Sequence, residues 1–453
     1  MASDDQYRLS RSLKVIRSGQ KVLLSRPDPV TGREITEIAG PDELLGLKIV
    51  TERLPIAALA REHKLPARSL YRLLSRLERR GILQAPNTLL RRDSGVFGAN
   101  VDDCWLTATS FELLLQVTNV CNLHCRHCYD RSRSVDMTVA QAAHVLDELE
   151  RFCERHWAQP HISITGGNPF LHRGFPEIYQ DVARRGLEIP IVGNPVARDQ
   201  LEAICRIKPP NVYQVSLEGR RTHTDWVRGA GSYDRAMAFL RVLQETNVDS
   251  CVMLTATTKN LGEILPLAVL LEGRTNGFSF SRLSRSGEGA ALDQPDPVAY
   301  RAFLGRYIEH AARSPVSTLK ENLINLMLAE SGQEPCDGCT GVGCGAAFNF
   351  LAVLPDGGVY ACRKFPSLIG NIYEQSLEEI YCSPKAAQYR RGMRACDGCP
   401  IRHACGGCMA AAQRPPEGVS AAYDRFCWRM PERWQSNNTA EPCNPGSGRS
   451  SVA

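Results

Sequence analysis

Residues 116–130 read QVTNVCNLHCRHCYD and follow directly on an apolar run that begins at Phe111. The stretch places Cys121, Cys125 and Cys128 immediately after a predicted strand, within eight residues. Three thiolates this close together can hold one face of a cubane iron–sulfur cluster, which leaves the fourth iron without a protein ligand. A structural zinc ion prefers four protein ligands and would have to recruit a nearby histidine, so the spacing favours the cluster.

The segment around this motif, residues 111–281, alternates short β-rich runs with helical stretches. Amphipathic segments such as VAQAAHVLDELERF (139–152) and YDRAMAFLRVLQE (233–245) lie between the runs. This alternation predicts βα units and a parallel sheet, whose catalytic groups lie on the loops that follow the strands. The strand candidates are ELLLQVT (112–118), HISIT (161–165), IPIVG (189–193), VYQVSL (212–217), CVMLTAT (251–257) and GFSFS (277–281).

Glycines and polar residues lie at the ends of the second, third and fourth predicted strands. A glycine pair by itself indicates no more than a tight turn. These positions share the sheet edge with the cysteine motif, where the catalytic groups of such sheets lie. The strand-end candidates are Gly166, Gly167, Asn168, Asn194, Ser216 and Glu218.

A second group of cysteines lies in a Pro- and Gly-rich region, residues 335–430, where one hairpin is predicted in FNFLAVLPDGGVYAC (348–362). The region offers little apolar core, so we expect bound metal to stabilise it. Paired cysteines of this kind occur in both zinc and iron–sulfur modules, and the group alone leaves both open. Its members are Cys336, Cys339, Cys344, Cys362, Cys396, Cys399, Cys405, Cys408 and Cys427.

The first motif, followed by the aromatic Tyr129, resembles the radical S-adenosylmethionine (SAM) superfamily. Over residues 108–330 this resemblance implies an α/β fold, a partial (βα)6 barrel, and a [4Fe–4S] cluster that binds SAM. It implies that Tyr129 and the strand-end candidates contact the cofactor. Asn168 stands where the family usually has Glu, and Glu218 stands where it usually has Asp.

The second group resembles the SPASM domain, which implies two auxiliary [4Fe–4S] clusters. One cluster would be held by Cys344, Cys362 and Cys408, with Cys339 or Cys336 as the fourth ligand. The other would be held by Cys396, Cys399, Cys405 and Cys427. The last spacing, C-x2-C, departs from the C-x3-C that is usual in the family.

Residues 1–95 repeat apolar residues at helical spacing and end in a basic helix, LSRLERRGIL (74–83), that stops at Gly81 before a short strand. This layout predicts a winged-helix-like domain. It also resembles the peptide-recognition domain of many peptide maturases, which pairs a leader peptide with a sheet edge. We expect a peptide here, and not nucleic acid. The helix arginines, which DNA phosphates could contact, are Arg68, Arg72, Arg76, Arg79 and Arg80.

The composition is that of a soluble globular protein of 453 residues, with 43% hydrophobic and 23% charged residues and a net charge of +5. No stretch reaches the roughly 20 apolar residues of a membrane span, and the polar start lacks a signal sequence, so we expect a cytoplasmic protein without a membrane partner. We expect residues 435–453 to be disordered. We interpret the single cysteines as buried residues: Cys104, Cys153, Cys205, Cys251, Cys382 and Cys443.

The resemblances together predict a radical SAM maturase, an oxidoreductase that cleaves SAM reductively to a 5′-deoxyadenosyl radical and abstracts hydrogen from a ribosomal precursor peptide or small protein. The product would be a thioether, a carbon–carbon crosslink, an epimer or an oxidised residue. The expected electron donor is a flavodoxin or ferredoxin. Two alternatives stay open: a sulfatase-type formylglycine maturase, and an iron–sulfur redox-sensing DNA-binding regulator.

Overall fold

The computed structural model describes residues 7–429, apart from positions 11, 20, 29–32, 53, 55–58, 60–69, 71–72, 75, 78–79, 85–89, 98–100, 132–135, 337, 342 and 413–417. The chain forms two compact units, residues 1–89 with 154–157 and residues 90–153 with 158–453. The tail that we expected to be disordered lies outside the described residues, as does Cys443.

Six parallel strands form the centre of the larger unit and confirm all six strand candidates. Each strand pairs with the next along the chain, with Leu115 beside Ile164 and Val215 beside Val252. Because the strands are parallel, their carboxyl ends meet at one edge of the sheet. The strands are β8 (Ser110–Thr118), β9 (Gln159–Gly166), β10 (Pro190–Val192), β11 (Val212–Ser216), β12 (Ser250–Ala256) and β13 (Gly277–Arg282).

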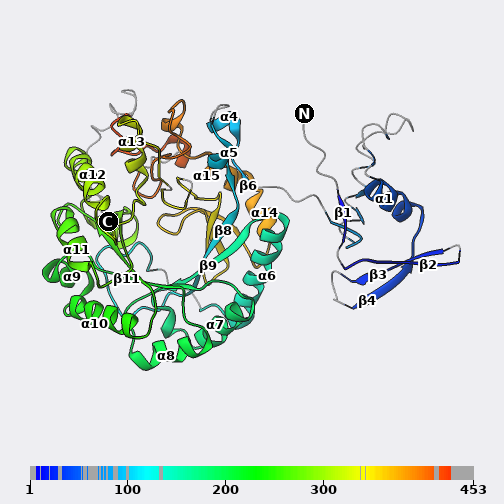
Figure 1. The fold of residues 1–453 in the computed structure, drawn as a ribbon, viewed down its shortest axis with the longest axis horizontal. Helices are drawn as coiled ribbons and strands as arrows, with labels where there is room; N and C mark the ends of the chain where they lie inside the picture. The colour runs from blue at the N-terminus through cyan, green and yellow to red at the C-terminus, as the bar shows by residue number, and fades with distance from the viewer. Residues whose placement is uncertain are drawn as a thin grey trace, which may run out of the picture. The chain divides into compact units, whose positions relative to one another are not determined.

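Helices surround these strands on their outer side (Figure 1). In α6 the apolar residues Ala142, Val145, Leu146 and Leu149 recur at helical spacing, and all four are buried in the core. Each helix returns the chain so that the next strand runs parallel to the last, which builds the partial barrel. The helices are α6 (Val139–Arg155), α7 (Phe175–Arg184), α8 (Arg198–Ile207), α9 (Arg221–Arg228), α10 (Ser232–Glu245) and α11 (Ile264–Leu271).

The cysteine-rich region continues the same sheet. β14 (Phe350–Val353) pairs in parallel with β8, and β15 (Gly358–Tyr360) and β16 (Leu368–Asn371) follow in antiparallel order to give nine strands. The first two confirm the predicted hairpin. The expectation of little apolar core is wrong, because Phe348 and Leu351 are fully buried in the core that also holds the barrel strands.

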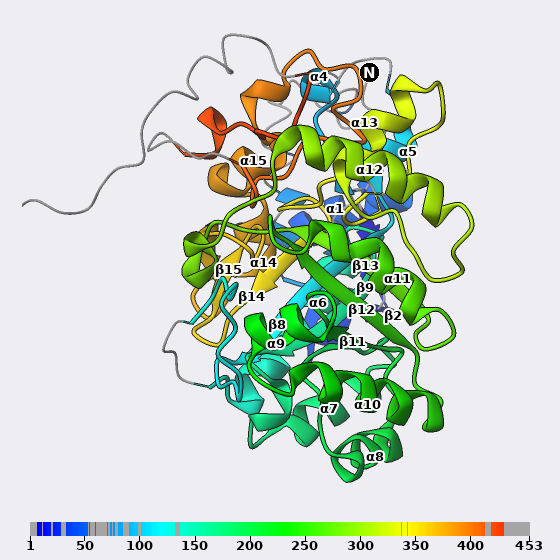
Figure 2. The ribbon, with the colours of Figure 1, turned by 90° about the vertical axis from the view of Figure 1, so that its left-hand side faces the viewer.

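Helices predicted between residues 297 and 330 are confirmed as α12 (Pro297–Ala311) and α13 (Asn322–Glu330). Figure 2 shows both at one end of the strands together with α15, whereas α7, α8 and α10 lie toward the other end. No described helix is both long enough and apolar enough to cross a membrane. The remaining elements of this unit are β6 (Leu90–Arg91), α4 (Ser94–Phe97), α5 (Asp103–Leu106), β7 (Thr107–Ala108), α14 (Leu377–Tyr381), α15 (Pro384–Arg391) and the 3-10 turns η1 (Pro169–Leu171), η2 (Leu261–Glu263), η3 (Gly287–Ala291), η4 (Arg394–Cys396) and η5 (Val419–Ala421).

The smaller unit contains a three-stranded antiparallel sheet with β3 in the middle. Its core holds Leu24 of β3 together with Leu73, Leu74 and Leu77 of the predicted basic helix. After Gly81 a short strand pairs with β1, which confirms the strand predicted there. The elements are β1 (Arg8–Leu9), β2 (Lys14–Ser18), β3 (Lys21–Pro27), β4 (Glu34–Ile38), α1 (Pro41–Thr51) and β5 (Leu83–Gln84).

The single cysteines differ in exposure. Cys153 is buried and Cys205 and Cys251 are half-buried, whereas Cys104 and Cys382 are exposed. The interpretation of the single cysteines as buried residues was therefore wrong for the last two, since residue type alone does not fix the face on which a cysteine lies.

Candidate active site and iron–sulfur sites

The loop after β8 carries the first three thiols, all of them half-buried. The Cys121 sulfur accepts hydrogen bonds from the Leu123 backbone N–H and the Asn194 side chain, both at 3.4 Å. The Cys128 thiol donates to the Asp130 carbonyl at 2.9 Å. The loop thus offers three sulfur donors, and the end of β10 supplies a polar group to one of them.

The glycine pair after β9 packs directly against this loop. The Gly167 N–H donates to the Thr118 carbonyl at 2.9 Å, and the Asn168 N–H donates to the Val120 carbonyl at 2.8 Å. A Cβ on Gly167 would lie 2.4 Å from the Val120 oxygen and 2.6 Å from Cys121 Cβ. Only glycine fits this approach, so its role here goes beyond a tight turn.

Asn194 and Glu218 belong to one buried polar network around Arg228. The Arg228 guanidinium donates to Asn194 Oδ1 at 3.0 Å and to Glu218 Oε1 at 3.1 Å. His127, from the cysteine loop, lies 3.2 Å from the same Glu218 oxygen. The network ties the ends of β10 and β11 to the loop.

The electrostatics of this network favour an ionised Glu218. Burial alone would raise the pKa of Glu218, but His127, then Arg228 and the Thr255 N–H, lower it to about 2. The residue is 1% exposed. Its carboxylate is therefore committed to neighbouring protein groups, whereas Ser216 at the same strand end is half-buried.

Tyr129 contacts a residue that sequence reasoning missed. Arg363, directly after Cys362, donates to the Tyr129 hydroxyl at 2.8 Å, to the Gly166 carbonyl at 3.3 Å and to Gln116. Its guanidinium lies 5.0 Å from the Tyr129 ring centre. One side chain of the cysteine-rich region thus joins the cysteine loop to the ends of β8 and β9. In the sequence, only the position of Arg363 next to the predicted ligand Cys362 could have drawn attention to it.

The first predicted ligand set was Cys344, Cys362 and Cys408 with Cys339 or Cys336, and the structure places Cys339 close enough to Cys344 and Cys362 to raise the pKa of both. Burial, and after it the neighbouring thiols of this set, raises the pKa of both Cys344 and Cys362 to about 12. The Cys336 thiol instead donates to Asn325 Oδ1 at 3.0 Å and to the Leu319 carbonyl at 3.3 Å. The arrangement favours Cys339 over Cys336 as the fourth ligand.

The second predicted set, Cys396, Cys399, Cys405 and Cys427, is also gathered in space. Burial first, and then Cys427 and Cys399, raises the pKa of Cys396 to about 12. Burial likewise raises the pKa of Cys427 to about 11, with Asp424 and Cys399 contributing. Such thiols stay protonated at neutral pH without a metal, and metal binding would release their protons.

A buried ion pair lies between the two sets. Arg282, the last residue of β13, donates to both oxygens of Asp424 at 2.6 and 2.7 Å. Asp424 also accepts the Cys408 N–H at 3.0 Å, and its charge raises the pKa of Cys427. Glu321 is the second acidic partner of Arg282. The barrel is thereby fixed to both cysteine sets through one guanidinium.

The donor set at all three places consists of thiols, as an iron–sulfur cluster requires. No three His, Cys, Asp or Glu side chains of the described residues converge on a single ion. The thiols of each set are thus neighbours, but among the described residues they do not close around one point. At the loop after β8, Cys121, Cys125 and Cys128 would hold the cluster, and the absence of a side chain on Gly167 leaves Cys121 the space that it occupies.

Comparisons with known proteins identify two segments. Residues 115–268 match the radical SAM superfamily, and residues 344–409 match the SPASM iron–sulfur cluster-binding domain. The antilisterial bacteriocin subtilosin biosynthesis protein AlbA of Bacillus subtilis is 27% identical over 361 residues, 75% of this chain and 75% of that protein. An AdoMet-dependent heme synthase of Methanosarcina barkeri is 25% identical over 326 residues, 66% of this chain and 90% of that one.

Solved structures share the fold. Streptococcus suis SuiB bound to the precursor peptide SuiA has a TM-score of 0.55 at 13% identity, covering 89% of this chain and 96% of that one. Fold, thiol loop and matched segments define an enzyme that uses SAM and iron–sulfur clusters. The chain is a radical SAM enzyme that carries a SPASM domain. Its cofactors are SAM, a SAM-binding [4Fe–4S] cluster and auxiliary clusters.

Proposed function

We propose that the protein is a peptide maturase. It cleaves SAM reductively to a 5′-deoxyadenosyl radical and abstracts hydrogen from a ribosomal precursor peptide, giving a thioether, a carbon–carbon crosslink, an epimer or an oxidised residue. The bound cluster supplies the electron for this cleavage. The protein is located in the cytoplasm in this proposal, because a reducing compartment keeps its many thiols free of disulfides and able to bind metal.

In this proposal each of the three regions of the chain has a separate role. Residues 1–95 recognise the peptide, residues 108–330 carry the radical chemistry, and residues 335–430 hold the auxiliary clusters. The SAM-binding cluster takes Cys121, Cys125 and Cys128 as ligands, and SAM lies against Tyr129, Gly166, Gly167, Asn168, Asn194 and Ser216. In this arrangement Glu218 does not contact SAM but positions its neighbours, because its carboxylate binds Arg228 and His127.

The edge strands of the smaller unit carry this proposal, since among the described residues β2 and β4 each pair with β3 alone. β2 is exposed along its whole length, with Val15 and Ile16 48% and 45% exposed. At the other edge, Ile38 of β4 is 57% exposed. An edge strand with unpaired backbone groups and apolar side chains can add an extended peptide as a further strand.

Ion pairs within the smaller unit argue against the DNA-binding alternative. Arg76 lies 2.9 Å from Asp42, and Arg80 contacts Glu37 and Glu43. These two arginines of the basic helix are neutralised by the protein itself and are poor phosphate contacts. Arg68, Arg72 and Arg79 lie outside the described residues.

A second candidate is tetrapyrrole modification, favoured by the likeness to the heme synthase over 90% of that protein. That match leaves about a third of this chain without a counterpart, whereas the peptide-bound SuiB structure covers 89% of it. The larger share of this chain that the peptide-bound SuiB structure covers supports a peptide over a tetrapyrrole.

The reconstituted enzyme with SAM, dithionite and the small peptide encoded beside its gene tests the proposal. We expect SAM-dependent modification, read by mass spectrometry, with epimers read by chiral amino-acid analysis and a formylglycine by its aldehyde. Ile16→Asp or Ile38→Asp should weaken peptide binding while SAM cleavage persists. Modification of an iron porphyrin and not of the peptide would overturn the proposal, as would tight binding to upstream DNA without SAM cleavage.

A further inference from the structure

Arg92, the residue that follows β6, is a buried cation without an acidic partner. It is 5% exposed. Its guanidinium donates to the Cys344 carbonyl at 2.6 Å and to the His403 carbonyl at 3.0 Å, and its Nε has no hydrogen-bond partner among the described residues. No carboxylate of the described residues balances its charge. Carbonyl oxygens accept its protons, but they do not supply the negative charge that a buried cation needs.

The other buried arginines have such a charge beside them. Four more arginines of the described residues are buried, and each contacts a carboxylate. The pairs are Arg26 with Glu37, Arg228 with Glu218, Arg282 with Asp424 and Arg402 with Asp397. Because the fold provides a carboxylate at these four guanidinium groups, Arg92 requires a different counter-charge.

Aromatic rings and a second cation surround Arg92. Its guanidinium lies 4.4 Å from the Phe348 ring centre and 5.0 Å from that of Phe97. Burial, and in smaller part the charge of Arg402, lowers the pKa of Arg92 to about 10, so the side chain stays charged at neutral pH. The rings attract the cation but carry no net charge. Charges are weakly screened in such surroundings, so a nearby anion acts strongly on Arg92.

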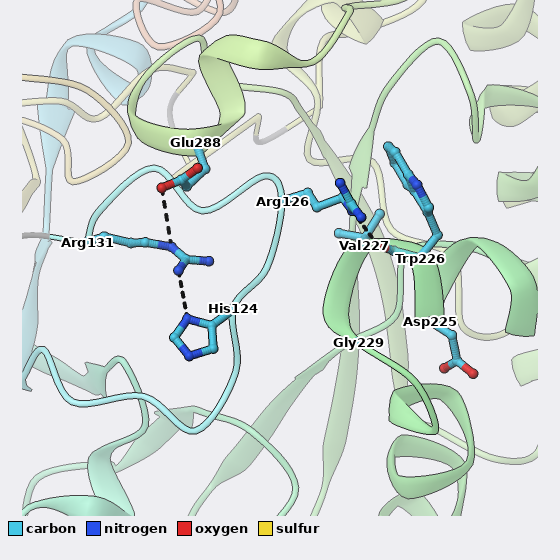
Figure 3. Close-up of a pocket in the computed structure, with 8 residues that line it drawn as sticks. All are labelled: His124, Arg126, Arg131, Asp225, Trp226, Val227, Gly229 and Glu288. Carbon is cyan, nitrogen blue, oxygen red and sulfur yellow. Dashed lines mark hydrogen bonds and ion pairs between the residues drawn. The ribbon is translucent and has the colours of Figure 1, made fainter.

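Arginines beside the cysteine loop after β8 do not share this feature. Arg126 and Arg131 line an open pocket of about 470 Å³ together with Asp225 and Glu288 (Figure 3). Arg131 lies 3.8 Å from Glu288. The two cations and two carboxylates balance each other, and the pocket is open to solvent, so that face needs no further anion.

Arg92 lies between segments that carry the two auxiliary cysteine sets. Cys344 belongs to the first set, and His403 lies within the segment that carries the second. A cavity of about 20 Å³ beside Arg92 is lined by Cys344 and by Cys396 of the second set. That volume holds about one water molecule, and no carboxylate or phosphate ligand fits it. The counter-charge of Arg92 is therefore not a bound organic anion.

A thiolate at Cys344 supplies the negative charge that Arg92 lacks. Its charge is the largest of those that raise the pKa of Arg92. A [4Fe–4S] cluster with four thiolate ligands carries net negative charge, and one-electron reduction makes that charge larger. A buried cation stabilises the reduced state more than the oxidised one, and it thereby raises the reduction potential of the cluster. The buried guanidinium and the thiol set are thus complementary in charge.

We propose that Arg92 is the buried counter-charge of the auxiliary cluster held by Cys344 and that it raises the reduction potential of this cluster. Arg92 acts through its charge and is not a catalytic residue. It lies outside both segments that match known families, residues 115–268 and 344–409. The inference rests on the auxiliary clusters of the proposed function and is independent of the peptide.

The test uses the reconstituted full chain with Cys121→Ala, Cys125→Ala and Cys128→Ala, so that the auxiliary clusters alone are titrated. An electrode supplies one electron to each cluster through a mediator, no bond forms or breaks, and electron paramagnetic resonance reads the reduced clusters. We expect Arg92→Gln to lower the equilibrium constant for reduction of one auxiliary cluster about tenfold, a fall of about 59 mV in its midpoint potential. Arg92→Lys keeps the charge and should stay close to the parent protein.

Arg391→Gln is the matched control. It removes the same charge from the lining of the same cavity, but the Arg391 side chain is 49% exposed and pairs with Asp397. Because solvent screens that charge, both auxiliary potentials should keep their parent values. Unchanged potentials in Arg92→Gln would overturn the inference, as would an equal fall in Arg92→Lys or in Arg391→Gln.

Iron analysis decides the case in which Arg92→Gln does not bind its cluster. Loss of about four irons in Arg92→Gln with full iron in Arg92→Lys would support the inference, because the charge is then needed to hold the cluster. Equal loss in both variants would overturn it, since the shape of the guanidinium would then be the requirement. A wild type that binds no auxiliary iron would overturn it as well. Auxiliary iron without peptide modification by wild type would contradict the proposed maturase and leave this inference intact.

Discussion

Gly167 shows how a single hydrogen in place of a methyl group sets the position of the cysteine loop. A Cβ there would lie inside the normal contact distance of both the Val120 oxygen and Cys121 Cβ. Neither atom can move without displacing a proposed ligand. The cysteine loop after β8 thus requires a glycine at position 167, which follows the neighbouring strand β9.

We expect Gly167→Ala to lower 5′-deoxyadenosine formation at least about tenfold, since overpacking of this kind costs roughly 1–3 kcal/mol. Iron bound at the first site should fall as well. Gly262→Ala is the control, because a Cβ there would have no neighbour within 4 Å. An equal loss in both variants would show that the close approach at Gly167 is not the cause.

Arg363 joins two residues that we propose as SAM contacts. It holds Tyr129 and Gly166, both proposed SAM contacts, through separate arms of its guanidinium. We expect Arg363→Lys to weaken SAM binding about tenfold in equilibrium dialysis, because an ammonium cannot reproduce this fork. Arg301→Lys, which replaces the guanidinium of a surface ion pair with Glu330, serves as control. Unchanged SAM affinity in Arg363→Lys would contradict the assignment.

At the scale of elements, the segment that follows α13 contains two cysteines, and their contacts indicate which one is the fourth ligand of the first auxiliary cluster. Cys336 is turned toward Asn325 and Leu319, whereas Cys339 lies with the three thiols of the first auxiliary set. We expect Cys339→Ser to lower the auxiliary iron content and Cys336→Ser to leave it unchanged, as read by iron analysis and electron paramagnetic resonance. Iron loss in Cys336→Ser alone would reverse the ligand choice.

The Arg282–Asp424 pair is the contact through which β13 holds the cysteine-rich region. Both side chains are 1% exposed, and Glu321 remains as the acidic partner of Arg282 when Asp424 is replaced. We expect Asp424→Asn to lower the free energy of unfolding by about 1–3 kcal/mol, measured by urea denaturation, because charge-assisted hydrogen bonds to Arg282 and to the Cys408 N–H are weakened. Disruption of the half-exposed pair Arg301–Glu330 should cost at most about 1 kcal/mol. Equal effects would mean that burial does not set the strength of the central pair.

At the scale of the whole molecule, local patterns predicted what local contacts build. The six barrel strands, the hairpin and the helices after residue 297 are visible in the sequence because their periodicity is set by neighbours a few residues away. Within each auxiliary cysteine set the thiols are near enough to raise one another's pKa, and the assignment of each set to a cluster stays a prediction.

Contacts between distant segments left no such pattern. The pairing of β14 with β8 joins residues more than two hundred positions apart, and no periodicity records it. The same holds for Arg363 at Tyr129 and for Arg282 at Asp424. Glu218 was found by position, but its partners His127 and Arg228 come from two other segments and required the fold.

The most direct measurement is SAM cleavage by the anaerobically reconstituted enzyme with dithionite, together with iron analysis. Wild type should release 5′-deoxyadenosine and bind about twelve irons, as three cubane clusters require. The triple variant Cys121→Ala, Cys125→Ala, Cys128→Ala should release none and keep about eight irons at the auxiliary sites. Retained cleavage in the triple variant would contradict the assignment of the SAM-binding cluster to the loop after β8.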